Sequence, residues 1–128
     1  MYLWDPDVWR LVGNYTLATE SETLPSVTAG FAFQDTFSER ISPYVTAAKH
    51  YHADEFIFEP YVGLVDRPNE SHVHALSGLR ISRGGVFIGL QHTGHELNAY
   101  LGANVRQAVG SIWIGEGQNY GVTLGYRF

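Results

Sequence analysis

Segments of this chain alternate between large apolar side chains and small or polar ones with a period of two residues. The last nine residues, 120–128, show the pattern without interruption. The large apolar residues are Tyr120, Val122, Leu124, Tyr126 and Phe128. The small or polar residues between them are Gly121, Thr123, Gly125 and Arg127. Successive side chains of a β-strand point to opposite faces, so this pattern predicts a strand with one apolar face.

The same alternation recurs in earlier segments, which we also expect to be strands: 9–19, 27–37, 41–51, 54–65, 72–82, 86–91 and 97–105. Polar or glycine-containing stretches separate them, most clearly the loop 66–71 and the tight hairpin at Arg83-Gly84. No segment has the 3.6-residue period of an amphipathic helix. The sequence therefore predicts a single all-β domain over residues 1–128, built as an antiparallel up-and-down β-barrel.

The number of strands depends on residues 106–119. If they form one long loop around Ile112-Trp113-Ile114, the chain has eight strands. If they contain a strand the count is nine, or ten when residues 2–8 also form one. We favour eight, because the two longest connections, 19–25 and 106–119, then lie at the same end, as in membrane barrels.

In the predicted barrel, the polar side chains face the interior and the apolar side chains face outward, which is the reverse of a soluble barrel. The set opposite the apolar residues carries many polar side chains: Arg10, Asn14, Gln34, Tyr44, Glu59, Arg80, Gln91, Asn98, Tyr100 and Arg127. A soluble barrel keeps its apolar side chains inside, whereas a membrane barrel turns them toward lipid. A buried Glu59 needs a cationic partner, for which we predict Arg10 or Arg80. The pattern favours a transmembrane β-barrel.

The end of the chain resembles the C-terminal assembly signal of bacterial outer-membrane β-barrel proteins, through Val122, Leu124, Tyr126 and Phe128. This resemblance implies a Gram-negative outer membrane, with membrane lipid, lipopolysaccharide and the barrel-assembly machinery as partners. We expect a monomeric membrane protein with a structural role or a binding role exerted through its loops. An eight-stranded barrel is filled by its own side chains, so we expect no large pore.

Composition narrows the choice of function further. The net charge is -5 and the eight Lys and Arg residues are scattered, which argues against nucleic acid as a partner. There is no cysteine, so disulfides and thiol chemistry are excluded. The first residues, 1–5, lack the basic region and apolar run of a secretory signal. We therefore expect either a mature form or, as an alternative, a soluble ligand-binding β-barrel or a structural protein of a particle.

Histidines provide a candidate metal site. His72 and His74 lie two residues apart, so both point to one side of a strand. A hairpin with Ser82 opposite Gly85 places His72 opposite His95 and His74 opposite Thr93, with Glu70 and Glu96 nearby. Three histidines with a carboxylate could bind a zinc-like divalent ion, and the alternative is a hydrogen-bonded polar plug. We expect no other cofactor, and we expect His50 and His52 to be solvated.

A second candidate lies in the sequence Gln91-His92-Thr93-Gly94-His95-Glu96. It is weakly similar to the His-x-Ser motif of lipid A 3-O-deacylases and outer-membrane phospholipases. That resemblance implies His92 as the general base, Thr93 as the nucleophile and Glu96 as the orienting acid. The serine position of the motif is occupied by Gly94, which has no nucleophile. A lipid hydrolase is therefore the alternative function, and we favour a protein that is not an enzyme.

Overall fold

A computed structural model describes residues 2–5, 8–34, 41–66, 72–116 and 120–128. These residues form eleven β elements: β1 (Tyr2–Asp5), β2 (Val8–Ala18), β3 (Ser26–Gln34), β4 (Ile41–Ala48), β5 (Tyr51–Ala53), β6 (Phe56–Asp66), β7 (Val73–Arg83), β8 (Val86–His92), β9 (Leu97–Val105), β10 (Ala108–Gly115) and β11 (Tyr120–Tyr126). The described part of the chain contains no helix of the length and apolar character needed to cross a membrane. The prediction of an all-β antiparallel protein is confirmed.

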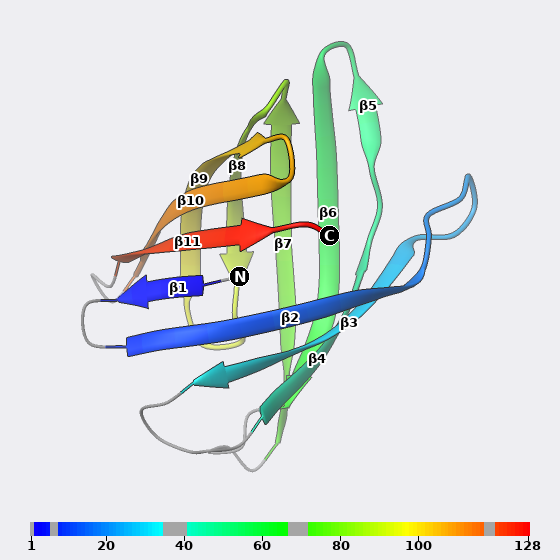
Figure 1. Cartoon of the computed structure of the whole chain (residues 1–128). Helices are drawn as coiled ribbons and strands as arrows, with labels where there is room; N and C mark the ends of the chain where they lie inside the picture. The colour runs from blue at the N-terminus through cyan, green and yellow to red at the C-terminus, as the bar shows by residue number, and fades with distance from the viewer. Residues whose placement is uncertain (1, 6–7, 35–40, 67–71, 117–119) are drawn as a thin grey trace.

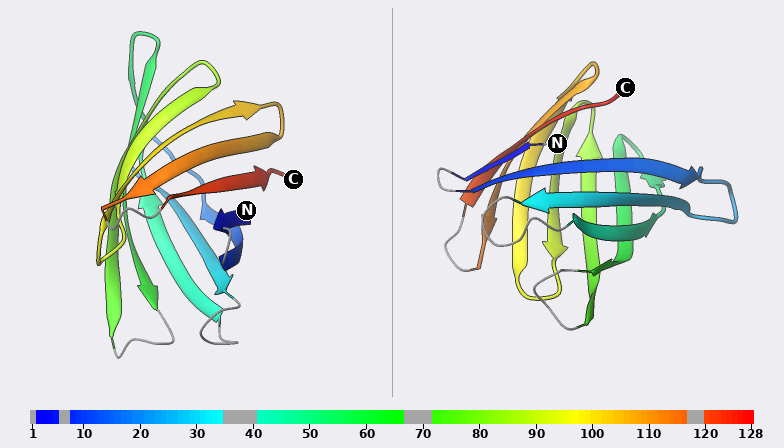
Figure 2. Two further views of the ribbon diagram at one scale, coloured as in Figure 1. Left: turned by 90° about the vertical axis from the view of Figure 1, so that its left-hand side faces the viewer. Right: turned by 60° about the horizontal axis from the view of Figure 1, so that its bottom comes forward.

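All of these elements belong to one antiparallel sheet that curls into an open, barrel-like shape (Figures 1 and 2). Neighbours in sequence are neighbours in the sheet, and β1 pairs with β11 through Tyr2 opposite Leu124. In addition, β4 pairs with β6. Each strand except the short β5, which pairs with β6 alone, therefore has a hydrogen-bonded partner on both sides, which leaves few unpaired backbone groups along the sheet.

β4 and β5 are two parts of one strand. β4 reaches Ala48 opposite Tyr61, and β5 continues with Tyr51 opposite Phe58, so the register against β6 is unchanged across the interruption. The backbone N–H of Lys49 donates to the carbonyl of Pro60 (3.2 Å). Counted in this way, the eleven elements make ten strands.

The preferred count of eight is wrong because residues 108–115 form β10, paired with both β9 and β11. Only two residues, Arg106 and Gln107, connect β9 to β10, and Arg106 has a left-handed φ of 56°. A two-residue hairpin turn requires such a backbone, which few residues other than glycine adopt readily. Neither glycine nor proline occurs at this turn, so no residue marks it in the sequence. The expected long connection at 106–119 therefore consists of the strand β10 and a shorter connection. β10 ends at the opposite end of the sheet from 19–25, so the expectation that the two longest connections share one end is wrong.

The hairpin between β7 and β8 also differs from the predicted register. Arg83 lies opposite Val86, and Gly84-Gly85 form the two-residue turn, with a φ of 59° at Gly84. The sequence predicts Ser82 opposite Gly85, whereas Ser82 lies opposite Phe87, two residues further along the chain. A shift of two residues keeps every side chain on its expected face, whereas a shift of one would reverse them all.

The predicted division into two faces is confirmed by the exposure of the side chains. In the strands that the sequence predicted, the exposed large apolar residues follow the predicted alternation and cover the convex outer face, for example Tyr15 and Leu101. Ile112 and Ile114 on β10, for which no face was predicted, are exposed on the same face. The inner face is less exposed. Only four described side chains other than glycine are buried, and all are on the inner face: Val65, His74, Phe87 and Thr123.

Inside the curl, aromatic rings lie over glycines of the neighbouring strand. Tyr61 is opposite Gly78, and Tyr100 is opposite Gly89. A Cβ atom added to either glycine would lie well under 3.0 Å from the tyrosine ring. Tyr44 over Gly30 and Trp113 over Gly121 repeat the arrangement. Small residues opposite large ones let a strongly curved sheet fill its own interior, and glycines ease the bending of the strands.

Candidate functional sites at the two ends of the sheet

The three histidines predicted to form a metal site do lie together. The ring centroids of His72 and His74 are 4.4 Å apart, as are those of His74 and His95. His74 is the central ring and is 8% exposed, while His72 and His95 are exposed. The rings meet although the predicted pairing of β7 with β8 was wrong, because the turn 93–96 brings His95 back over β7.

That turn is held by its own backbone. The N–H of Thr93 donates to the carbonyl of Glu96 (3.0 Å), and Gly94 has a φ of 93°. A Cβ atom on Gly94 would lie 2.8 Å from the Cβ of His74. Gly94 therefore allows the turn to approach His74 closely and to adopt a backbone that L-residues rarely adopt. This is a structural reason for a glycine where the hydrolase motif has serine.

The described residues contain no group of three or more His, Asp or Glu side chains arranged to hold a metal ion. The three imidazoles face one another as tilted rings, with interplanar angles of 43° and 49°. Metal ligation needs ring nitrogens that converge on one point. Glu70, which we expected near the cluster, lies outside the described residues. Metal binding at His72, His74 and His95 stays a prediction.

The predicted catalytic residues occupy different faces. His92 is exposed and pairs with Ser77 and Leu97 on the outer face. The backbone N–H of Gly94 donates to Nδ1 of His92 (3.2 Å). The carboxylate of Glu96 lies on the inner side, with Oε2 3.4 Å from a Cβ atom built on Gly115.

The hydroxyl of Thr93 contacts the turn itself. The backbone N–H of Glu96 lies 3.4 Å from Oγ1 of Thr93, and Oγ1 is also 3.4 Å from the carbonyl oxygen of Glu96. A Ser-His-Asp type of site requires the base to reach the nucleophile and the acid to reach the base. The three residues are close in the sequence, but the side chains of His92 and Glu96 lie on opposite faces of the sheet. Their catalytic roles stay predictions.

The other end of the sheet holds an arrangement that sequence reasoning missed. His50 lies between β4 and β5, and its two ring nitrogens face two carboxylates. Nδ1 is 2.5 Å from Oε2 of Glu20, in the β2–β3 connection, and Nε2 contacts Oε2 of Glu59 on β6. We expected His50 to be solvated. The side chain is indeed 41% exposed, but its two carboxylate partners were not expected. Glu20 is 30 residues away in the sequence, so no local spacing indicates the contact.

These contacts shift the pKa values of His50 and Glu20. The hydrogen bond with Glu20, followed by the charges of Glu59 and Glu20, raises the pKa of His50 above its ordinary 6.5 despite some desolvation. Hydrogen bonds from the ring and the backbone of His50 lower the pKa of Glu20 below its ordinary 4.5. Opposite charges at this distance favour both ionised forms.

Glu59 also lies directly opposite Arg80 in the sheet, as one of the two predicted pairings requires. The guanidinium of Arg80 stacks over the ring of Phe87, 3.9 Å from its centroid. Tyr61 and Tyr100 share a hydrogen bond beside these charges. The side chain of Arg10, the other predicted partner, lies outside what the structure describes. The inner face is thus a connected set of polar and aromatic groups.

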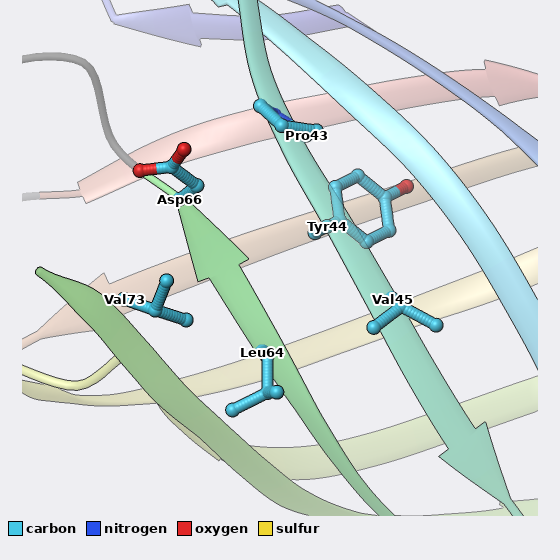
Figure 3. Close-up of a pocket in the computed structure, with 6 residues that line it drawn as sticks. All are labelled: Pro43, Tyr44, Val45, Leu64, Asp66 and Val73. Carbon is cyan, nitrogen blue, oxygen red and sulfur yellow. The ribbon is translucent and has the colours of Figure 1, made fainter.

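A shallow depression of about 270 Å³ lies on the sheet where β4 and β6 separate (Figure 3). Its lining residues are mainly apolar: Pro43, Tyr44, Val45, Leu64, Asp66 and Val73. The ladder between β4 and β6 begins at Tyr44 opposite Val65, so Pro43, which has no N–H, lies just beyond it. The hydroxyl of Ser42 donates to the carbonyl of Asp66 (2.6 Å) and connects the two strands there.

Comparisons of the chain with protein-family models, with curated proteins and with solved structures give no match. The case for a function therefore rests on the distribution of side chains over the sheet and on the two sites described above.

Proposed function

We propose that this chain is a small integral β-barrel protein of a Gram-negative outer membrane, with a structural role or a binding role exerted through its connections. The observation that carries the proposal is the apolar outer face. Side chains such as Leu101, Ile112 and Leu124 stand exposed on neighbouring strands, and polar groups occupy the inner face. Exposed apolar patches larger than a few hundred Å² mark contact with protein or membrane.

The extent of exposed surface supports this proposal. The accessible surface is 8986 Å², whereas a compact soluble protein of 14.3 kDa has about 6,800 Å². Among the described residues, only Val65 and Phe87 are buried hydrophobic side chains. So small a core leaves the apolar outer face as the main surface available for burial. Lipid is the environment that would cover it on all sides.

Part of the arrangement of the connections supports a membrane barrel. Three two-residue turns, 54–55, 84–85 and 106–107, lie at one end of the strands, although the seven-residue connection 19–25 lies at that end too. The last strand ends at that same end, since the N–H of Arg127 donates to the carbonyl of Gln107 (2.9 Å). Outer-membrane barrels combine short turns at one end with longer loops at the other. In such a setting, lipid, lipopolysaccharide and the barrel-assembly machinery are the partners we propose, and the chain acts as a monomer.

The test is whether the folded chain needs an amphiphile. We expect the purified protein to stay folded only in detergent or lipid, to float with lipid vesicles on a density gradient, and to migrate differently in gels before and after heating. These properties follow from a barrel whose outer face contacts hydrocarbon and whose ladder is closed. A monomer that is folded in plain buffer would refute the proposal in favour of a soluble barrel.

The alternative of a lipid hydrolase has a separate test. If the chain cleaves acyl esters, His92→Ala removes that activity, and an unmutated protein without cleavage eliminates the alternative. For the histidine cluster, metal content of the intact protein is compared with that of His72→Ala and His95→Ala. Absence of metal from the unmutated protein after exposure to zinc leaves the polar plug as the interpretation.

A further inference from the structure

His50 has a carboxylate oxygen on each of its ring nitrogens, which has a chemical consequence. A neutral imidazole has one N–H donor and one acceptor, and a carboxylate accepts only. Both contacts, Nδ1 to Glu20 and Nε2 to Glu59, are therefore hydrogen bonds only when His50 is protonated. Charge-assisted hydrogen bonds of this kind are about twice as strong as neutral ones.

Further bonds from the same two residues attach the β2–β3 connection to the sheet. The backbone N–H of His50 donates to Oε1 of Glu20 (2.9 Å), and Nζ of Lys49 donates to the carbonyl of Glu22 (2.7 Å). Inside the connection, the N–H of Ser21 donates to the carbonyl of Leu24 (3.0 Å). The connection is thus a closed turn joined to the sheet chiefly through Lys49 and His50.

We propose that Glu20, His50 and Glu59, which we call the His50 bridge, form a pH-dependent link between the β2–β3 connection and the sheet. With His50 protonated, the ring joins two segments that the backbone ladder does not join, because Glu20 lies beyond the end of β2 and Glu59 is on β6. With His50 neutral, one carboxylate faces a nitrogen that cannot donate, so the connection loses one of its links and is held less firmly, chiefly by the backbone N–H of His50 and by Nζ of Lys49. This device is additional to the proposed membrane role and does not depend on it.

The direction of the pH dependence follows from the two shifted groups. The raised pKa of His50 means that its contribution is complete below 6.5 and is lost as pH rises through the folded value. The lowered pKa of Glu20 means that its contribution is complete above 4.5 and is lost as pH falls through its folded value. The His50 bridge is therefore strongest between 4.5 and 6.5.

The other charged groups around His50 preserve this direction. Lys49, next to His50 in the chain, also interacts with Glu20 and favours its ionised form. On the other side, Glu59 lies opposite Arg80 on β7, so its carboxylate has a cationic neighbour apart from His50. The titrating member of the bridge near neutral pH is therefore His50.

The experiment is amide hydrogen exchange on the full chain, in the medium that keeps it folded, compared at a pH between 4.5 and 6.5 and at about pH 9. After correction for the intrinsic effect of pH on exchange, we expect the amides of residues 19–24 to exchange about tenfold faster at the higher pH. His50→Gln and Glu20→Gln should show the faster exchange at both values. Glu22→Gln is the matched control, since only its backbone carbonyl takes part, and it should behave like the unmutated protein.

A second measurement needs no variant. In protein labelled with ¹⁵N at histidine, both ring nitrogens of His50 should carry protons at pH values where an ordinary histidine is already neutral. Equal exchange of residues 19–24 at both pH values, or an ordinary titration of His50, would overturn the proposal. The same holds if Glu22→Gln accelerates exchange as much as Glu20→Gln.

Discussion

The outer and inner faces of this sheet are built from the same strands but follow opposite rules. On the outer face, Leu101 is 48% exposed and is surrounded by Ile88 and Ile112, which are exposed to a similar degree. On the inner face, Phe87 is 4% exposed and has the guanidinium of Arg80 over its ring. The apolar face is thus the open one, and the partly polar face is the one that packs.

This inversion indicates where the stability of the fold resides. Inner side chains fill a curved surface in which each tyrosine or tryptophan has a glycine opposite it, so small changes of volume should matter there. Outer side chains touch little within the chain, so their importance depends on the medium around them. Substitutions on the two faces can therefore separate the packing of the fold from its environment.

The largest effect is expected for Leu101→Arg. At the midplane of a bilayer an arginine on the lipid-facing side of a barrel costs about 2–4 kcal/mol of stability. In water, an exposed site of this kind would change stability by no more than about 0.5 kcal/mol. The measurement is denaturant unfolding of the protein folded in lipid vesicles.

Val105→Arg is the control for Leu101→Arg. Val105 is also on the outer face but lies at the end of β9, beside the turn at 106–107. Near the interface the cost of an arginine falls to about 0–1 kcal/mol. If both substitutions have equally small effects, the outer face does not lie in hydrocarbon.

An intermediate effect is expected for Gly89→Ala on the inner face. The added methyl group meets the ring of Tyr100 and lies 2.8 Å from the backbone carbonyl oxygen of Leu79. Forcing an extra methyl group into such a site costs about 1–3 kcal/mol. The free energy of unfolding, measured in the medium that keeps the protein folded, reports this change.

Gly110→Ala is the matched control on the outer face, where a Cβ atom would meet its nearest neighbour, Cδ2 of Leu124, at 3.6 Å. That is an ordinary van der Waals distance, so we expect a change within about 0.5 kcal/mol. Equal destabilisation by the two substitutions would contradict the packing of Tyr100 over Gly89.

The smallest effect is expected from removing single tyrosine hydroxyls. Tyr100→Phe removes a hydrogen bond to Tyr61 on the inner face, and a typical intramolecular hydrogen bond contributes about 1 kcal/mol. Tyr126→Phe removes a bond from an exposed hydroxyl to Oε1 of Gln107 (2.6 Å), which should matter less because the group is accessible. Thermal unfolding of both variants provides the comparison, and a larger loss for Tyr126→Phe would be inconsistent with it.

Sequence alternation predicted most of the strands and the face of nearly every side chain. It failed where the backbone gave no local signal. Arg106 occupies a left-handed position that would ordinarily suggest glycine, so β10 was read as a possible loop. The register of β7 with β8 was misjudged by two residues because either Arg83-Gly84 or Gly84-Gly85 is an acceptable turn.

The sites depend still more on tertiary structure. The sequence brought His72, His74 and His95 into one cluster, since two lie on one strand and the third follows the next turn. It did not reveal that their rings contact one another at tilted angles, because ring orientation depends on the backbone of the 93–96 turn. Nor did it reveal the pairing of His50 with Glu20 and Glu59.

By itself, then, the sequence determined an antiparallel sheet with an apolar face and a polar face, because side-chain direction in a strand depends only on the parity of the residue number. Only the tertiary structure decided which strands meet, how many there are, and that His50 bridges two carboxylates. Those outcomes depend on turn geometry and on contacts between distant residues. Neither of these can be predicted from the alternation of apolar and polar residues along the sequence.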